Sequence, residues 1–215
     1  MEPTRRPTVE PRVIEVFADV CCPFTHVGLR RFVEHRRTIG RPDITLRVRA
    51  WPLEIVNGAP LDPDFIAEEV DDIRAQVAPS LFAGFRVSTF PATSMPALTL
   101  AAAANRAGPA VGEAVSLELR DLLFEQGVDI ADPGVLARVA ADHDLRPDDD
   151  DIAAVHADHD EGVRRGVIGS PHFFTPVGGF FCPALDVSRD DHGHLRIVAD
   201  PDGFDAFLAS CFTSP

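Results

Sequence analysis

The architecture of this chain is set by the segment Val13-Ile14-Glu15-Val16-Phe17-Ala18-Asp19-Val20-Cys21-Cys22-Pro23-Phe24-Thr25-His26-Val27-Gly28. Its first residues are mostly apolar and β-branched, which is typical of a short buried strand. Proline suits the first turn of a helix, where its missing N–H leaves no hydrogen bond unmade. We therefore expect a strand over residues 13–18, followed by a helix that begins beside Cys22 and Pro23 and runs to about Thr38.

A second strand and a long helical stretch follow. Over residues 44–51 apolar and polar side chains alternate, as in a half-buried strand. From about residue 60 to 165 the signals are helical. Asp-Pro pairs at 62–63 and 132–133 fit a helix N-cap followed by proline at the first helical position. The acidic run 142–151 predicts a solvated loop.

Strand character returns near the end of the chain. Residues 172–176 and 180–185 flank Val177-Gly178-Gly179, which predicts a hairpin. Residues 195–199 favour one more short strand, and Asp200-Pro201 begins a final helix with an apolar face. The expected order is strand–helix–strand, a helical block, then strands and a last helix.

Composition excludes several classes of protein. The 215 residues are 45% hydrophobic, enough for a real core, and no apolar run is long enough to cross a membrane. A net charge of −14 argues against a nucleic-acid partner. Residues 1–12 are polar and do not read as a secretory signal, so we expect a cytoplasmic protein.

The chain has four cysteines, at positions 21, 22, 182 and 211, and no Cys-x-x-Cys pair. In a reducing compartment this predicts no disulfide framework. Cys22 stands out because a helix N-terminus favours a thiolate and lowers the pKa of the thiol there. Thr25 lies three residues on and His26 one helical turn on, where each could act on the sulfur.

Two segments resemble the DsbA family. Asp19-Val20-Cys21-Cys22-Pro23-Phe24-Thr25-His26-Val27-Gly28 is similar to its active-site segment, above all to the cytosolic FrnE-like branch, which reads Asp-x-x-Cys-Pro-Trp-Cys-Tyr-x-Gly. Gly166-Val167-Ile168-Gly169-Ser170-Pro171-His172 resembles the family's Gly-Val-x-Gly-(Val/Thr)-Pro segment. The resemblance implies that Pro171 is cis and faces Cys22.

The resemblance also implies the fold. It is an α/β thioredoxin fold with a helical insertion, formed by residues 12–56 and 166–215, with an inserted helical domain at 57–165. The chain departs from the family at Thr25, which stands where the second, resolving cysteine is expected. Without that thiol, a mixed disulfide at Cys22 cannot be released by its neighbour.

Three functions stay open. The first is a thiol-disulfide oxidoreductase that works through Cys22, with an external thiol as resolver. The second is a transferase or isomerase that activates a bound small thiol, like the kappa-class transferases and 2-hydroxychromene-2-carboxylate isomerases. It predicts a pocket between the two subdomains. The third is a non-catalytic binding module. We expect a small thiol or a protein disulfide as partner, no resident cofactor or metal, and leave a homodimer open.

The candidate site has two parts. Cys22, Thr25 and His26 are the candidate catalytic residues. Pro23, Phe24, Ser170, Pro171 and His172 are the candidate substrate-binding residues. Cys182 is a weaker candidate for a distant resolving thiol, whereas Cys21 and Cys211 are expected in the core. Arg49 and Trp51 could line a cleft, with packing the favoured interpretation for Trp51.

Overall fold

The computed structural model describes residues 12–190 and 195–212, so nearly all of the N-terminal segment 1–12 lies outside them. The central sheet is built from four strands, β1 (Arg12–Ala18), β2 (Ile44–Ala50), β3 (His172–Thr175) and β4 (Gly178–Phe181). Their order is β2-β1-β3-β4. β1 and β2 are parallel, whereas β3 is antiparallel to both β1 and β4.

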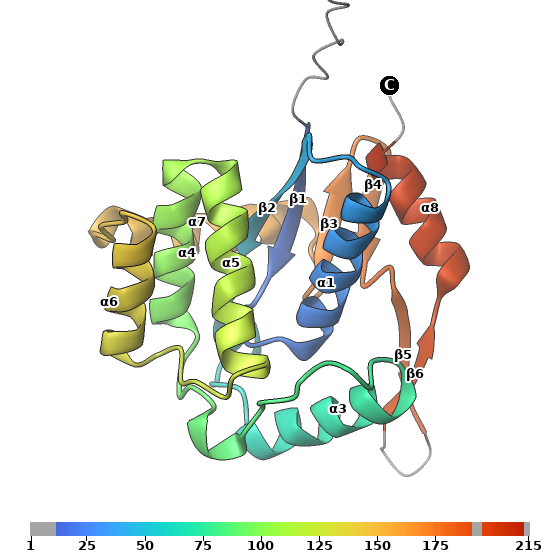
Figure 1. Ribbon diagram of the computed structural model, residues 1–215, viewed down its shortest axis with the longest axis horizontal. Helices are drawn as coiled ribbons and strands as arrows, with labels where there is room; N and C mark the ends of the chain where they lie inside the picture. Colours follow the sequence, from blue (N-terminus) through green and yellow to red (C-terminus); the bar gives the residue numbers. More distant parts are fainter. Residues whose placement is uncertain (1–11, 191–194, 213–215) are drawn as a thin grey trace, which may run out of the picture.

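Two helices cover one face of this sheet, α1 (Pro23–Thr38) and α8 (Pro201–Phe212). An apolar cluster joins them to the strands and includes Ile14 of β1, Phe32 of α1 and Phe207 of α8, each at most 1% exposed. In Figure 1 α1 crosses in front of the sheet and α8 lies at the end away from the helical block. The expected strand–helix–strand start is therefore confirmed.

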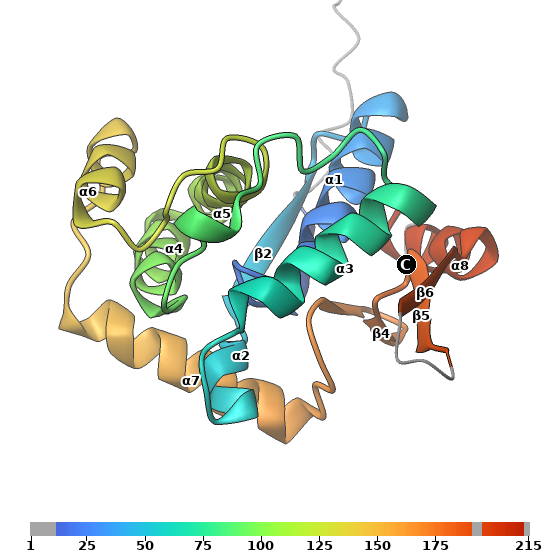
Figure 2. The ribbon, with the colours of Figure 1, turned by 90° about the horizontal axis from the view of Figure 1, so that it is seen from below.

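The opposite face is covered by α7 (Asp149–Arg165), which lies across the sheet from α1 in Figure 2. Phe17 and Trp51 pack there at 0% and 4% exposure. Gly162 of α7 makes this contact possible, because a Cβ on it would lie only 2.5 Å from the Trp51 ring. Trp51 is thus a packing residue, as favoured from the sequence.

A helical block lies between β2 and β3 in the chain and forms one side of the molecule (Figure 1). Asp62 and Asp132 cap its helices as expected, each accepting two backbone N–H bonds. Its elements before α7 are α2 (Leu53–Asn57), α3 (Pro63–Gln76), the 3-10 helix η1 (Val87–Thr89), α4 (Met95–Ala107), α5 (Pro109–Phe124) and α6 (Pro133–Asp142). The largest apolar cluster joins this block to α1 and β2.

Two expectations need correction. The acidic run 142–151 is not a loop throughout, because Asp148 and Asp151 form a capping box that starts α7, and Asp151 is 1% exposed. The expected strand 180–185 stops at Phe181, since Cys182 takes a left-handed backbone with φ +42°. The chain then forms a second hairpin, β5 (Leu185–Arg189) with β6 (Leu195–Ala199). In the described part of the chain, no helix has both the length and the apolar character needed to span a membrane.

Candidate functional site

Cys22 lies between β1 and α1, at the N-cap position of the helix. Its backbone N–H donates to the carbonyl of Asp19 at 3.4 Å. The Asp19 carboxylate fixes this turn, because it accepts hydrogen bonds from the N–H of Cys21, the N–H of Leu53 and the hydroxyl of Ser94 at 2.7–3.0 Å. The buried Asp19 side chain therefore fixes where the thiol stands.

The loop before β3 brings Ser170 and Pro171 against Cys22. The Ser170–Pro171 peptide bond is cis, as the sequence resemblance implied. The Cys22 thiol donates to the carbonyl oxygen of Ser170, with 3.2 Å between Sγ and O. The Pro171 ring packs over α1, where a Cβ added to Gly28 would lie 3.5 Å from its Cγ. Two segments almost 150 residues apart thus meet at the sulfur.

Two buried hydroxyls complete the immediate surroundings of the thiol. Ser170 Oγ accepts from the backbone N–H of Asp19 at 3.0 Å and lies 2.8 Å from Thr25 Oγ1. Since Ser170 already accepts one hydrogen bond there, its own proton is available to Thr25. The Thr25 proton is then available to the sulfur, and Thr25 does form a side-chain hydrogen bond with Cys22.

These groups act on the Cys22 pKa in opposite directions. Burial is the largest effect and raises the pKa, since Cys22 is 4% exposed. The side chains of Thr25 and Ser170 and the backbone N–H of Thr25 lower the pKa, and the charge of Glu69 on α3 raises it. The net pKa is above the ordinary value, so the sequence-based expectation of a lowered pKa is not met. The reason is that desolvation outweighs the hydroxyl bonds and the helix N-terminus.

His26 does not take up the position expected of an acid–base group. Its Nε2 pairs with Glu125 Oε1 at 2.7 Å, and its ring packs against Phe82 and Phe124. Burial lowers the pKa of His26, while the hydrogen bond to Glu125 opposes that change. Because its ring is 1% exposed and bonded to the helical block, His26 anchors α1 to α5 and is not a group facing the sulfur.

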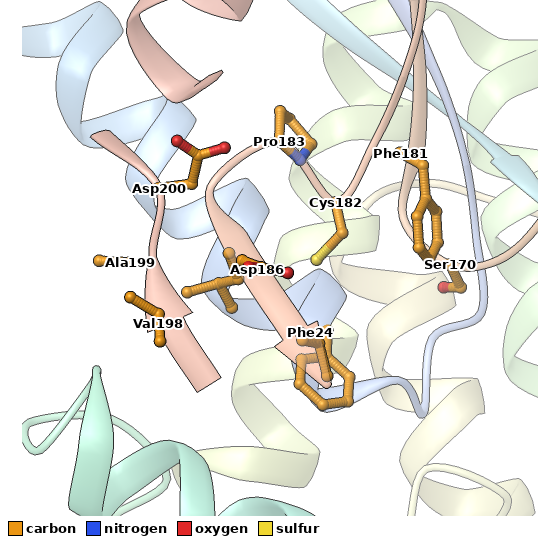
Figure 3. Close-up of a pocket in the computed structure, with 11 residues that line it drawn as sticks. Phe24, Ser170, Phe181, Cys182, Pro183, Asp186, Val198, Ala199 and Asp200 are labelled. Carbon is orange, nitrogen blue, oxygen red and sulfur yellow. The ribbon is translucent and has the colours of Figure 1, made fainter. Parts of the chain in front are cut away.

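A cavity of about 670 Å³ opens beside Ser170 and Phe24. In Figure 3 Ser170 and Phe181 stand on one side of it, and Val198 and Asp200 stand on the other. The wall is formed by Phe24, Ser170, Phe181, Cys182, Pro183, Leu185, Asp186, Val187, Val198, Ala199 and Asp200. All of these residues come from α1 and from the chain after α7, so the cavity does not lie between two subdomains.

Only some of the expected substrate-binding residues line the cavity. Phe24 and Ser170 line the cavity, and Pro23 is the buried first residue of α1. His172 does not line it, because its ring stacks on Phe174 with centroids 4.8 Å apart, and its Nδ1 accepts from the N–H of Ile168. Burial lowers the pKa of His172, and the residue serves the β3–β4 packing.

The other cysteines differ in their surroundings. Cys21 and Cys211 belong to the two main apolar clusters, as expected for core residues. Cys182 lines the cavity, and its N–H donates to the carbonyl of Pro171 at 2.9 Å. Burial raises the pKa of Cys182 to about 12, and the nearby Cys22 also raises it. A thiol with this pKa is almost entirely protonated at neutral pH and is a poor resolving nucleophile.

Sequence reasoning missed the far wall of the cavity. Asp186 and Val198 lie on the β5–β6 hairpin, of which only β6 was expected. β5 reads Leu-Asp-Val-Ser-Arg, a pattern with only two apolar positions, and every residue after Leu185 is exposed. Arg49, a possible cleft residue, instead bonds Asp158 and Glu15 on the other face of the sheet.

Comparison with known families agrees with this geometry. Residues 13–189 match the DSBA-like thioredoxin domain. The match spans most of the chain, from β1 to β5, and includes both motifs that meet at Cys22. The chain belongs to the family of DSBA-like thioredoxin domains. A search of curated proteins finds no match in sequence.

Solved structures share the fold at low sequence identity. The cytosolic disulfide reductase DsbM from Pseudomonas aeruginosa has a TM-score of 0.60 and 16% identity, over 91% of this chain and 96% of that one. The same protein is also known in a structure with GSH, with a TM-score of 0.56 and 15% identity, over 91% and 96%. A 2-hydroxychromene-2-carboxylate isomerase has a TM-score of 0.58 and 13% identity, over 79% and 88%. At these identities the likeness establishes the thioredoxin fold alone.

Proposed function

We propose that this protein is a thiol-disulfide oxidoreductase that uses Cys22 as its one attacking thiol. The observation that carries the proposal is the placement of the Cys22 sulfur. It lies at the N-terminus of α1, 3.2 Å from the Ser170 carbonyl oxygen, next to a cavity that Ser170 itself lines. The amide groups of the helix terminus and the hydroxyl of Thr25 favour the thiolate against the effect of burial.

Each turnover of Cys22 needs two exchanges. Cys22 loses its proton, and its sulfur attacks one sulfur of a disulfide R–S–S–R, so that a Cys22–S–S–R bond forms and the S–S bond of the substrate breaks. The leaving R–S⁻ takes up a proton. A thiol from solution, R′–SH, then loses its proton and attacks the R sulfur of the mixed disulfide, so that R–S–S–R′ forms and Cys22 is released as its thiolate. A second R′–SH reduces R–S–S–R′ in the same way, which gives R–SH and R′–S–S–R′. The substrate gains two electrons and the external thiols supply them.

The resolving thiol comes from outside the protein in this proposal. Thr25 occupies the position of the second cysteine of the family, and the high pKa of Cys182 makes that residue a weak substitute. A low-molecular-weight thiol is then the co-substrate, and no resident cofactor or metal takes part. Such thiols are abundant and reduced in the cytoplasm, where we propose that the protein acts. The likeness to a cytosolic disulfide reductase supports this choice.

A small-thiol-dependent isomerase or transferase is the second candidate. The cavity is large enough for a small molecule, which favours it. Its wall, however, lies wholly outside the helical block. A cavity of about 440 Å³ does lie between the block and the thioredoxin part, as this hypothesis predicted, but neither Cys22 nor Ser170 lines it. The oxidoreductase is therefore the better supported function.

Steady-state kinetics test the proposal. We expect the wild type to catalyse the reduction of hydroxyethyl disulfide by an excess of a small thiol, and Cys22→Ser to abolish the catalysis. Cys211→Ser is the matched control, because this cysteine is 0% exposed in the apolar cluster under α8. Activity that survives in Cys22→Ser would favour the isomerase or transferase mechanism. An unreactive wild type with an intact fold would favour a non-catalytic binding module.

A further inference from the structure

The cavity beside Cys22 carries charges of one sign. Asp186 and Asp200 lie on its wall, and among the described residues that line it there is no arginine, lysine or histidine. Asp186 is exposed on β5. Asp200 stands at the N-terminus of α8, where its Oδ1 accepts the N–H of Gly203 at 2.8 Å. A group entering the cavity therefore meets two carboxylates.

Two basic side chains of this region, Arg31 and Arg189, contact other parts of the protein. Arg31 of α1 donates to the carbonyls of Ala184 and Val77, at 3.0 and 3.1 Å. Arg189 lies over the Phe65 ring, with 5.1 Å from its Cζ to the ring centroid. Glu69 adds a further acidic group on the Cys22 side. The two arginines are thus held by the protein and do not line the wall, although the charge of Arg31 lowers the pKa of Cys182 there.

Three further residues of the wall are apolar and open to solvent. Phe181 and Val198 are each 48% exposed and Val187 is 37% exposed, although all three are large hydrophobic residues. Figure 3 shows Phe181 on one side of the cavity and Val198 on the other. Exposed apolar side chains gathered around a cavity indicate a surface that a ligand covers. The ligand should then offer apolar atoms together with a positive charge.

We propose that the co-substrate of this protein is a small aminothiol, whose apolar part packs between Phe181 and Val198 and whose ammonium group lies near Asp186 and Asp200. This inference rests on the proposed function and specifies its substrate. Thiols that carry carboxylates, such as glutathione, are disfavoured because the two wall carboxylates repel them. In the resolving step the aminothiol attacks the mixed disulfide at Cys22. Its own disulfide probes the same part of the cavity, because attack by Cys22 on that disulfide releases the aminothiol as the leaving group.

Three small disulfides of different charge test this inference. Cystamine is cationic, hydroxyethyl disulfide is neutral and dithiodipropionate is anionic. The rate of adduct formation at Cys22 is measured for each disulfide. It is then divided by the rate at which the same disulfide reacts with free mercaptoethanol, which removes differences in intrinsic reactivity between the disulfides. We expect the normalised rate with cystamine to exceed that with dithiodipropionate by about tenfold or more at low salt, as two nearby carboxylates permit. High salt should reduce this ratio.

Substitutions locate the effect. Asp186→Asn and Asp200→Asn should each lower the ratio several-fold, and asparagine keeps the capping role of residue 200. Asp142→Asn on α6 makes the same change of net charge far from the cavity and should leave the ratio unchanged. If Cys22 reacts with all three disulfides but the normalised rates are equal, the aminothiol inference is wrong and the proposed function stands. If Cys22 reacts with none, the proposed function fails and the inference fails with it.

Discussion

Replacing Thr25 with valine tests how the thiolate of Cys22 is stabilised. Thr25 is fully buried, its hydroxyl lies 2.8 Å from Ser170 Oγ, and its side-chain hydrogen bond lowers the pKa of Cys22. Valine keeps the size and branching of the side chain but removes the hydrogen bond to the thiolate. The pKa of Cys22 should therefore rise further, because burial would be opposed by one hydrogen bond fewer.

The size of the effect follows from the kind of bond that is lost. A hydrogen bond to a charged group contributes about 1.5–3 kcal/mol, which corresponds to about a ten- to hundredfold change in the thiolate population. The thiolate that still forms is a stronger nucleophile, with a Brønsted coefficient of about 0.4–0.5, and this offsets roughly half of the loss on a logarithmic scale. The rate of Cys22 at pH 7 should fall about three- to tenfold.

The assay is the second-order rate constant of Cys22 with iodoacetamide, measured as a function of pH. We expect Thr25→Val to move the rise of the rate to higher pH and to lower the rate at pH 7. Thr99→Val is the matched control, because the Thr99 hydroxyl bonds only its own helix, at the Met95 carbonyl. A pH profile of Thr25→Val that overlays the wild type would refute the assigned role of this hydroxyl.

Three further predictions concern the residues around the site. Thr25→Cys restores the dithiol pattern of the family. The introduced thiol should displace an adduct from Cys22 as R–SH and form a disulfide with Cys22, which mass spectrometry detects as a protein without adduct and two hydrogens lighter than the reduced form. A lasting adduct would contradict the assigned geometry. Glu69 has a pKa raised by burial to about 7 and its charge raises the pKa of Cys22, so Glu69→Gln should lower the pKa of Cys22 and speed its alkylation above pH 7, whereas the exposed neighbour Glu68→Gln should not. Burial alone would raise the pKa of Glu125. The hydrogen bonds that its carboxylate accepts from His26, Phe82 and Ala83 outweigh burial and lower the pKa to about 2 from an ordinary 4.5. Its contribution to stability is therefore present above about pH 4.5 and lost as the pH falls toward 2, and urea unfolding should show the deficit of Glu125→Gln shrinking over that range; a deficit independent of pH would argue against it.

Short-range sequence preferences were sufficient to predict the secondary-structure elements on either side of the Cys22 thiol. The strand before Asp19, the proline at the start of α1 and the alternation of β2 each reflect a short-range preference, and all three elements formed where expected. The Asp62 and Asp132 caps followed for the same reason. The approach of Ser170 to Cys22 could be expected only from the family resemblance, because nothing local in either segment encodes that contact.

Long-range packing accounts for what the sequence could not predict. Helical spacing puts His26 one turn from Cys22, but its ring bonds Glu125, which directly follows α5 and lies about 100 residues away in the chain. The pKa of Cys22 depends on how deeply the folded chain buries the sulfur, which no local pattern records. The strand β5 offers only two apolar positions, Leu185 and Val187, and both line the cavity, so its pattern was too short to predict a strand.

Peptide mapping of the native protein, after brief exposure to a small neutral disulfide, identifies the cysteine that carries the adduct. Although Cys22 is only 4% exposed, we predict that it is modified first, through the cavity, while Cys21 and Cys211 stay free. First modification of Cys182, or modification of Cys22 only after the protein unfolds, would contradict the claim that the sulfur at the start of α1 is the working group of this protein.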